Sequence, residues 1–259
     1  MYITNGMFRY GHLSRTVRIL IWVFTGIFLV QFVMPSSVEL LILHIFGLSV
    51  TGIMQGWWWQ FLTYAFLHGG FLHLILNMIG LYFLGPELER HMGPRAFLAM
   101  LIFCAILGGI GWFALRYPYE GVCVGASAGI FGLIGAFAGL FPRRELTLLI
   151  FFVLPVTMPA WLLAVLFGLL QLAYLFEPSS SGIAYSAHLA GGIAGFIYVR
   201  VLYRGYEGRY TGLDFIPKKS RETGPSKDEI DMILDKVSMQ GIHSLSARER
   251  AILQKASRR

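Results

Sequence analysis

Long apolar runs separated by short polar segments dominate the chain as far as about residue 203. The six runs lie at about residues 17–34, 60–84, 95–115, 126–142, 147–175 and 183–203. A membrane-spanning helix needs about 20 mostly apolar residues, whereas a membrane β-barrel shows roughly ten-residue alternating segments. We therefore predict an all-α polytopic membrane protein, a bundle of six transmembrane helices. Two prolines, Pro155 and Pro159, predict a kink or a late start in the fifth helix.

The composition agrees with a membrane protein. Only 14% of the residues are charged, where a soluble domain has about 25%, and 30 residues are glycine, which transmembrane helices use more than soluble ones. The two cysteines do not form a disulfide framework, and no zinc-binding spacing is present. We expect neither a cofactor nor a metal.

Lysine and arginine predict the orientation of the bundle. Of the 21 basic residues, only Arg116 falls on the face that holds the first, third and fifth connections. Because basic residues stay on the cytoplasmic side, both termini are predicted to be cytoplasmic. The compact form and the lack of a Ser/Arg-rich leader predict a multi-pass protein of a bacterial inner membrane.

The polar C-terminal part predicts a separate region. We assign residues 1–203 to a six-span membrane domain and residues 204–259 to a cytosolic linker with a small helical tail. Apolar residues at helical spacing predict its first helix, and they are Ile230, Ile233, Leu234 and Val237. Ser246 and Glu249 have the spacing of a capping box, which predicts the start of a second helix.

Five polar side chains fall in the outer half of the predicted bundle, on the helices that enter from the outer face. They are His68, His73, Asn77, Ser127 and His188. Alone, a serine among glycines is most often a helix-packing residue, and an asparagine is an interhelical hydrogen-bonding group. Ionisable residues inside membranes are rare and usually functional. The shared depth of all five therefore favours a catalytic site.

Serine becomes a nucleophile only when a base within about 2.6–3.2 Å takes its proton. His188 is the candidate base for Ser127, and glycines, Gly191 and Gly195 among them, let the two helices approach. No acidic residue outside the tail lies at this depth, so a Ser–His dyad is expected, with His188 oriented by packing or a hydroxyl. His73 and Asn77 share one helix face and could donate hydrogen bonds to an oxyanion.

These residues together resemble the rhomboid intramembrane serine proteases. The similar motifs are Gly125-Ala126-Ser127-Ala128, Ala187-His188 followed by Gly191 and Gly195, and His68, His73 and Asn77 in H-x-x-x-x-H-x-x-x-N. The resemblance implies that Ser127 and His188 are catalytic and that His73 and Asn77 line the oxyanion hole. It also implies that His68 is structural, that Glu89 is a packing residue, and that the fifth span is a lateral gate. The implied substrate is a transmembrane helix, cut near its outer end.

Two positions depart from the family pattern. Where the first loop of the family often has Trp-Arg, this chain has Trp59-Gln60. Where many members have a tyrosine that stacks on the catalytic histidine, this chain has Phe131, which keeps the ring.

Three other functions compete with an active protease. A catalytically inactive rhomboid-like protein would bind or escort membrane proteins, but such relatives typically lack the serine or the histidine. A channel or transporter would show paired charges or broken helices near the midplane. A metal site at His68, His73 and His188 would lack an accompanying carboxylate or thiol. The prediction is therefore an intramembrane serine endopeptidase whose partners are transmembrane substrates and the bilayer.

Overall fold

A computed structural model describes residues 13–118, 121–150, 153–175, 184–203 and 227–256 of the chain. The chain divides into two compact units, Met1–Tyr206 and Glu207–Arg259, and each is described by itself. The predicted linker and tail begin at residue 204, and residues 204–226 lie outside the described residues.

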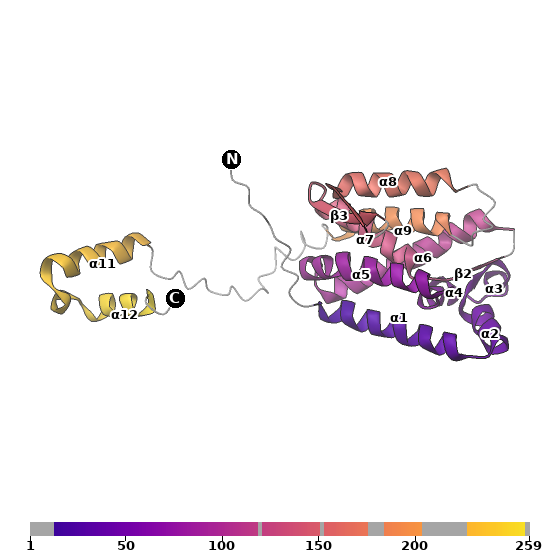
Figure 1. The fold of residues 1–259 in the computed structure, drawn as a ribbon, viewed down its shortest axis with the longest axis horizontal. Helices are drawn as coiled ribbons and strands as arrows, with labels where there is room; N and C mark the ends of the chain where they lie inside the picture. Colours follow the sequence, from indigo (N-terminus) through magenta and orange to yellow (C-terminus); the bar gives the residue numbers. More distant parts are fainter. Residues whose placement is uncertain (1–12, 119–120, 151–152, 176–183, 204–226, 257–259) are drawn as a thin grey trace. The chain divides into compact units, whose positions relative to one another are not determined.

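The first unit is a helical bundle with two small strand pairs (Figure 1). Its longer helices are α1 (Arg15–Val33), α2 (Ser36–Phe46), α5 (Phe71–Met92), α6 (Pro94–Arg116), α7 (Ser127–Leu140), α8 (Ala160–Ala173) and α9 (Tyr185–Ile197). The short helices are α3 (Val50–Met54), α4 (Gln60–Thr63), the 3-10 helix η1 (Tyr64–Phe66) and the π-helix η2 (Tyr198–Tyr203), which continues α9. The strands are β1 (Leu48–Ser49), β2 (Val122–Cys123), β3 (Glu145–Ile150) and β4 (Leu154–Pro159), and β1 pairs with β2 and β3 with β4, both antiparallel.

Three helices of the described chain, α1, α5 and α6, are long and apolar enough to cross a membrane. Helices α7 and α8 are apolar but have 14 residues each. Large apolar side chains are widely exposed along the bundle, such as Trp22 (71% exposed), Phe32 (75%) and Phe71 (68%). Soluble monomers rarely expose so much apolar surface, so these faces contact lipid. The fold is a polytopic helical bundle, and six complete spans remain a prediction.

Two predicted spans were placed incorrectly. The second, predicted at 60–84, is divided between α4, η1 and α5, and α5 starts only after Gly69 and Gly70. Helix α5 continues to Met92 because Glu89 is buried there and accepts hydrogen bonds from the N–H groups of Thr16 (3.2 Å) and Val17 (3.1 Å) at the start of α1. That contact satisfies the free amides of a helix N-terminus.

The fifth predicted span, 147–175, begins as a hairpin and not as a helix. Residues 145–150 and 154–159 form β3 and β4, and α8 starts directly after Pro159, so the late start predicted from the prolines is confirmed. Proline fixes its own φ and disfavours helical geometry in the residue before it, which accounts for the boundary.

Helix α7 lies at the centre of the unit and packs closely against α9. Ten of its 14 residues are buried, and it also contacts α5, α6 and α8. Glycines form the seam with α9: a Cβ at Gly191 would overlap the backbone of Ala128, and one at Gly195 would overlap the backbone of Gly132. The predicted close approach of these two helices is confirmed.

The loop between α1 and α5 is anchored by Gln60, at the position where the family often has arginine. Gln60 is fully buried. Its Oε1 accepts a hydrogen bond from the Ser49 N–H (3.0 Å), and its Nε2 donates to the His44 carbonyl (2.9 Å). One amide side chain therefore joins three segments of this loop, α2, β1 and α4.

Replacing Gln60 by leucine should destabilise the protein by about 1–3 kcal/mol, because buried backbone groups would lose their partners. The measurement is thermal unfolding of the purified protein in detergent. The matched control is Gln55→Leu, the same change at an exposed glutamine of the same loop. Equal melting temperatures for the two variants would contradict an anchoring role.

The second unit contains α11 (Lys227–Gln240), the 3-10 helix η3 (Ile242–Ser244) and α12 (Ala247–Ala256). The predicted capping box is present: Glu249 accepts from the Ser246 N–H (2.7 Å), and the Ser246 hydroxyl accepts from the Glu249 N–H (3.3 Å). Lys236 on α11 bridges to Glu249 at 2.9 Å. The hydrogen bond from Lys236, followed by that from the Ser246 backbone, lowers the pKa of Glu249 to about 2. The two helices are thus tied by one carboxylate.

Candidate active site

Ser127 is the first residue of α7, and the loop before it is shaped around Gly125. Gly125 has φ +122°, a conformation that favours glycine, and its N–H donates to the Tyr64 carbonyl at 2.9 Å. A side chain at this position would also meet the His73 ring, with Cε1 only 2.5 Å from an added Cβ. The His73 ring therefore lies against the backbone of Gly125, two residues before the serine.

His188 lies in the first turn of α9 and contacts the serine directly. Its Nε2 is 2.7 Å from the Ser127 Oγ. The Phe131 ring stacks on the imidazole, with centroids 4.4 Å apart and an interplanar angle of 6°. The structure brings together the predicted nucleophile, the predicted base and the aromatic residue one turn after the serine.

A third polar side chain, which the sequence analysis did not identify, contacts the other nitrogen of the imidazole. Gln171 on α8 places its Oε1 2.9 Å from the His188 Nδ1, and its side chain is buried. We expected packing or a hydroxyl to orient His188. The Phe131 ring does pack on the imidazole, but the polar partner is the amide of Gln171 and not a hydroxyl. The sequence feature that could have identified this residue is a single glutamine within the apolar run of the fifth predicted span, because polar residues inside membranes are usually functional.

His73 and Asn77 lie on the first two turns of α5, one turn apart. Asn77 is buried, and its Nδ2 has no hydrogen-bond partner among the described residues. A buried amide donor without a partner is energetically unfavourable. An acceptor that enters the site would be stabilised by hydrogen bonds from these N–H groups.

His68 lies before α5 and not on the helix, unlike the prediction. Its side chain is buried, and its ring meets His73 edge-on with centroids 5.4 Å apart. Its backbone N–H donates to Oε1 of Gln31, a buried glutamine of α1 (3.2 Å). His68 therefore contacts the His73 ring and does not reach the serine through any described contact.

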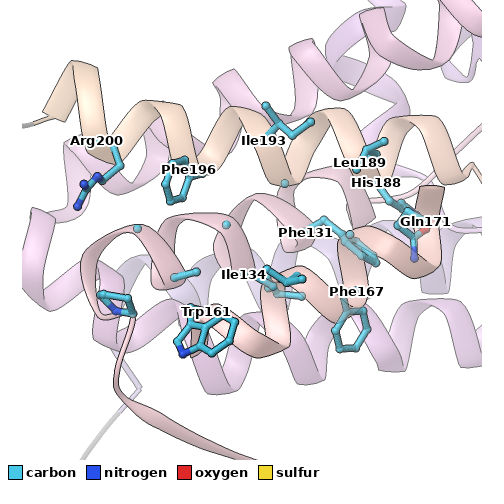
Figure 2. A pocket seen from close by; sticks show the side chains of 18 residues that line it. Phe131, Ile134, Trp161, Phe167, Gln171, His188, Leu189, Ile193, Phe196 and Arg200 are labelled. Carbon is cyan, nitrogen blue, oxygen red and sulfur yellow. Dashed lines mark hydrogen bonds between the residues drawn. The ribbon is translucent and has the colours of Figure 1, made fainter. Parts of the chain in front are cut away.

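An apolar cavity of about 450 Å³ opens beside His188, between α7, α8 and α9. His188 and Gln171 lie at one end of it and Arg200 at the other, with Phe131, Phe167 and Phe196 between them (Figure 2). No group of three His, Cys, Asp or Glu side chains arranged to hold a metal ion occurs among the described residues.

Comparison with known proteins places the chain in a family. A model of the rhomboid domain matches residues 55–205, and a family of unknown function (DUF6576) matches residues 221–259. The chain is 34% identical over 161 residues to the protein named "Putative rhomboid protease YdcA" of Bacillus subtilis, covering 61% of this chain and 74% of that protein.

Other relatives differ in compartment and activity. Rhomboid protein 1, mitochondrial, of Saccharomyces cerevisiae is 34% identical over 140 residues, 52% of this chain and 39% of the yeast protein. Inactive RHOMBOID-like protein 8 of Arabidopsis thaliana is 32% identical over 94 residues, 36% of this chain and 26% of the plant protein. The relatives therefore do not single out the bacterial inner membrane that the sequence predicted.

The rhomboid match covers more than half of the chain, and the apolar bundle fits a protein embedded in a bilayer. The chain belongs to the rhomboid family of membrane proteins.

Proposed function

We propose that the chain is an intramembrane serine endopeptidase that cleaves transmembrane helices of membrane proteins near their outer end. The observation that carries the proposal is the 2.7 Å contact between the Ser127 Oγ and the His188 Nε2. A hydroxyl and an imidazole at this distance form an activated nucleophile, and few other functions require the pair.

In the proposed reaction, the Ser127 Oγ attacks a peptide carbonyl of the substrate while the His188 Nε2 takes its proton. The same nitrogen then gives the proton to the leaving amine, and an acyl-enzyme forms. Water, deprotonated by His188, releases the acyl group and restores the hydroxyl. General-base assistance of this kind contributes about 10²–10⁴ in rate.

The tetrahedral intermediate carries an oxyanion, which needs preorganised donors. Ser127 begins α7, so its N–H belongs to the amides that a helix leaves unpaired at its N-terminus. The His73 ring, held against Gly125, and the unpaired Nδ2 of Asn77 support a second and a third donor on α5.

Substrate entry follows from the family resemblance and from the exposure of α8. Its outer face is apolar and open to lipid, as at Trp161 (50% exposed) and Leu169 (57%). We propose α8 as the lateral gate through which a substrate helix reaches the serine. Both termini of the chain would be cytoplasmic, as the distribution of basic residues predicts, with residues 1–203 as the protease domain and 204–259 as the cytosolic part.

The alternative is a catalytically inactive rhomboid-like protein that binds or escorts membrane proteins. A relative from Arabidopsis thaliana is named as inactive. Labelling with a fluorophosphonate probe, wild type against Ser127→Ala, decides between the two. An active protease reacts through Ser127, and an inactive binder does not react there.

Asn77→Ala should lower the rate of substrate cleavage about 10- to 1000-fold, because one oxyanion donor is lost. Probe labelling of Ser127 should persist, since the nucleophile and its base are untouched. Cleavage kinetics and probe labelling of the same preparation measure both effects. The control is Gln55→Ala, which removes a side-chain amide from an exposed site and should cleave at the wild-type rate. Full cleavage activity in Asn77→Ala would remove this residue from the oxyanion hole.

A further inference from the structure

We propose that Gln171 is a positioning residue for the catalytic histidine, so that the working unit is Ser127–His188–Gln171. This inference rests on the proposed protease function. Gln171 would not touch the substrate. It would act through the His188 ring, whose orientation and tautomer it fixes.

The imidazole of His188 is held from three directions. Ser127 contacts Nε2 at 2.7 Å, Gln171 contacts Nδ1 at 2.9 Å, and Phe131 covers a ring face. Figure 2 shows Gln171 and His188 together at one end of the cavity, with Phe131 beside them. Because Gln171 is only 5% exposed, little water competes for its amide at this contact.

The direction of the amide decides which tautomer of His188 is present. Oε1 can only accept, so its contact requires the proton on Nδ1, and the lone pair is then on Nε2, facing the Ser127 hydroxyl. This is the tautomer that a general base needs. The second group that orients a catalytic histidine is often a carboxylate, but a neutral amide supplies the same acceptor without placing a charge inside the membrane.

Gln171 comes from α8, whereas Ser127 and His188 come from α7 and α9. Two further ring contacts hold this end of α8 in place: Phe167 meets Phe131 edge-on at 5.9 Å, and Tyr174 stacks on Tyr185 at 5.5 Å. The position of α8 therefore determines whether the acceptor for Nδ1 is present.

The test compares Gln171→Met, which keeps the length of the side chain and removes the acceptor, with Gln171→Glu, which keeps an acceptor oxygen. We expect Gln171→Met to lower kcat about 10- to 100-fold, as misplaced catalytic groups do, with KM within about twofold of wild type. The rate of fluorophosphonate labelling should fall by the same factor. Gln171→Glu should recover most of the lost kcat. Gln55→Met, at an exposed site, is the control and should match wild type.

Three results of the cleavage assay would overturn the proposal: an unchanged kcat in Gln171→Met, a loss that appears only in KM, or a loss of kcat that Gln171→Glu fails to recover. The probe is small and needs no opening of a gate, so a loss of cleavage with normal labelling would also count against it. Failure of the protease function itself is recognised separately, because wild type would then show neither labelling of Ser127 nor cleavage.

Discussion

Ser127→Ala and His188→Ala are each expected to abolish cleavage of a transmembrane substrate. Without the Ser127 hydroxyl no acyl-enzyme can form, and the rate should fall by about 10⁴-fold or more. Without the imidazole the hydroxyl keeps its proton, and the rate should fall by about the same factor. Cleavage of a substrate reconstituted in liposomes measures both, and labelling by a fluorophosphonate should be lost in parallel.

Matched controls for these variants exist on the same bundle. Ser186→Ala removes a hydroxyl from the first turn of α9, and His91→Ala removes an exposed imidazole near the end of α5. Both should cleave at the wild-type rate, and all four variants should unfold near the wild-type temperature. Cleavage by Ser127→Ala at the wild-type peptide bond would refute the protease proposal.

Gly191→Ala and Gly195→Ala are expected to destabilise the protein by about 1–3 kcal/mol each. An added Cβ at either position overlaps the backbone of α7, which cannot move aside as a flexible side chain would. The two helices must then separate, and because Ser127 and His188 lie on opposite sides of this seam, the cleavage rate should fall as well. Thermal unfolding in detergent and cleavage kinetics measure the two effects.

Gly192 provides an internal comparison on the same helix. A Cβ there would lie 3.6 Å from the Phe131 carbonyl oxygen, an ordinary contact. Gly192→Ala should therefore be neutral or slightly stabilising, since alanine favours a helix over glycine by roughly 0.5–1 kcal/mol. If Gly191→Ala and Gly195→Ala were as stable as Gly192→Ala, the backbone contact of α7 and α9 would not be what holds this seam.

Hydrophobic patterning predicts a helix best where residues that favour a helix start and a helix end bound the apolar run. The third predicted span, 95–115, matches α6 at Pro94–Arg116, because proline starts the helix and a polar segment ends it. The pattern fails where an apolar segment is not a helix, or where a helix contains a buried acidic residue. Residues 60–70 are apolar without forming one continuous helix, residues 145–150 and 154–159 are apolar and form strands, and Glu89 is acidic yet buried within a helix.

Part of the candidate site could be predicted from the sequence. Ser127 and His188 attract attention because a lone nucleophile and a lone imidazole are unusual at one depth among glycines. Gln171 could not be placed from the sequence, because its role depends on how α8 packs against α9. The anchoring by Gln60 likewise depends on three segments meeting, which no local pattern encodes.

The hairpin of β3 and β4 has a consequence for the surrounding lipid. A two-stranded sheet presents backbone groups along both outer edges, and hydrocarbon cannot satisfy them, so headgroups or water must reach the hairpin. Helix α8, which follows it directly, has 14 residues and spans about 21 Å, against about 30 Å for an average hydrocarbon layer. If α8 spans the membrane as the sequence predicts, the bilayer must be locally thinned beside it to meet both conditions. A neighbouring helix of normal length would be too long for this annulus, and its end would protrude into the aqueous interface before it touched the protein.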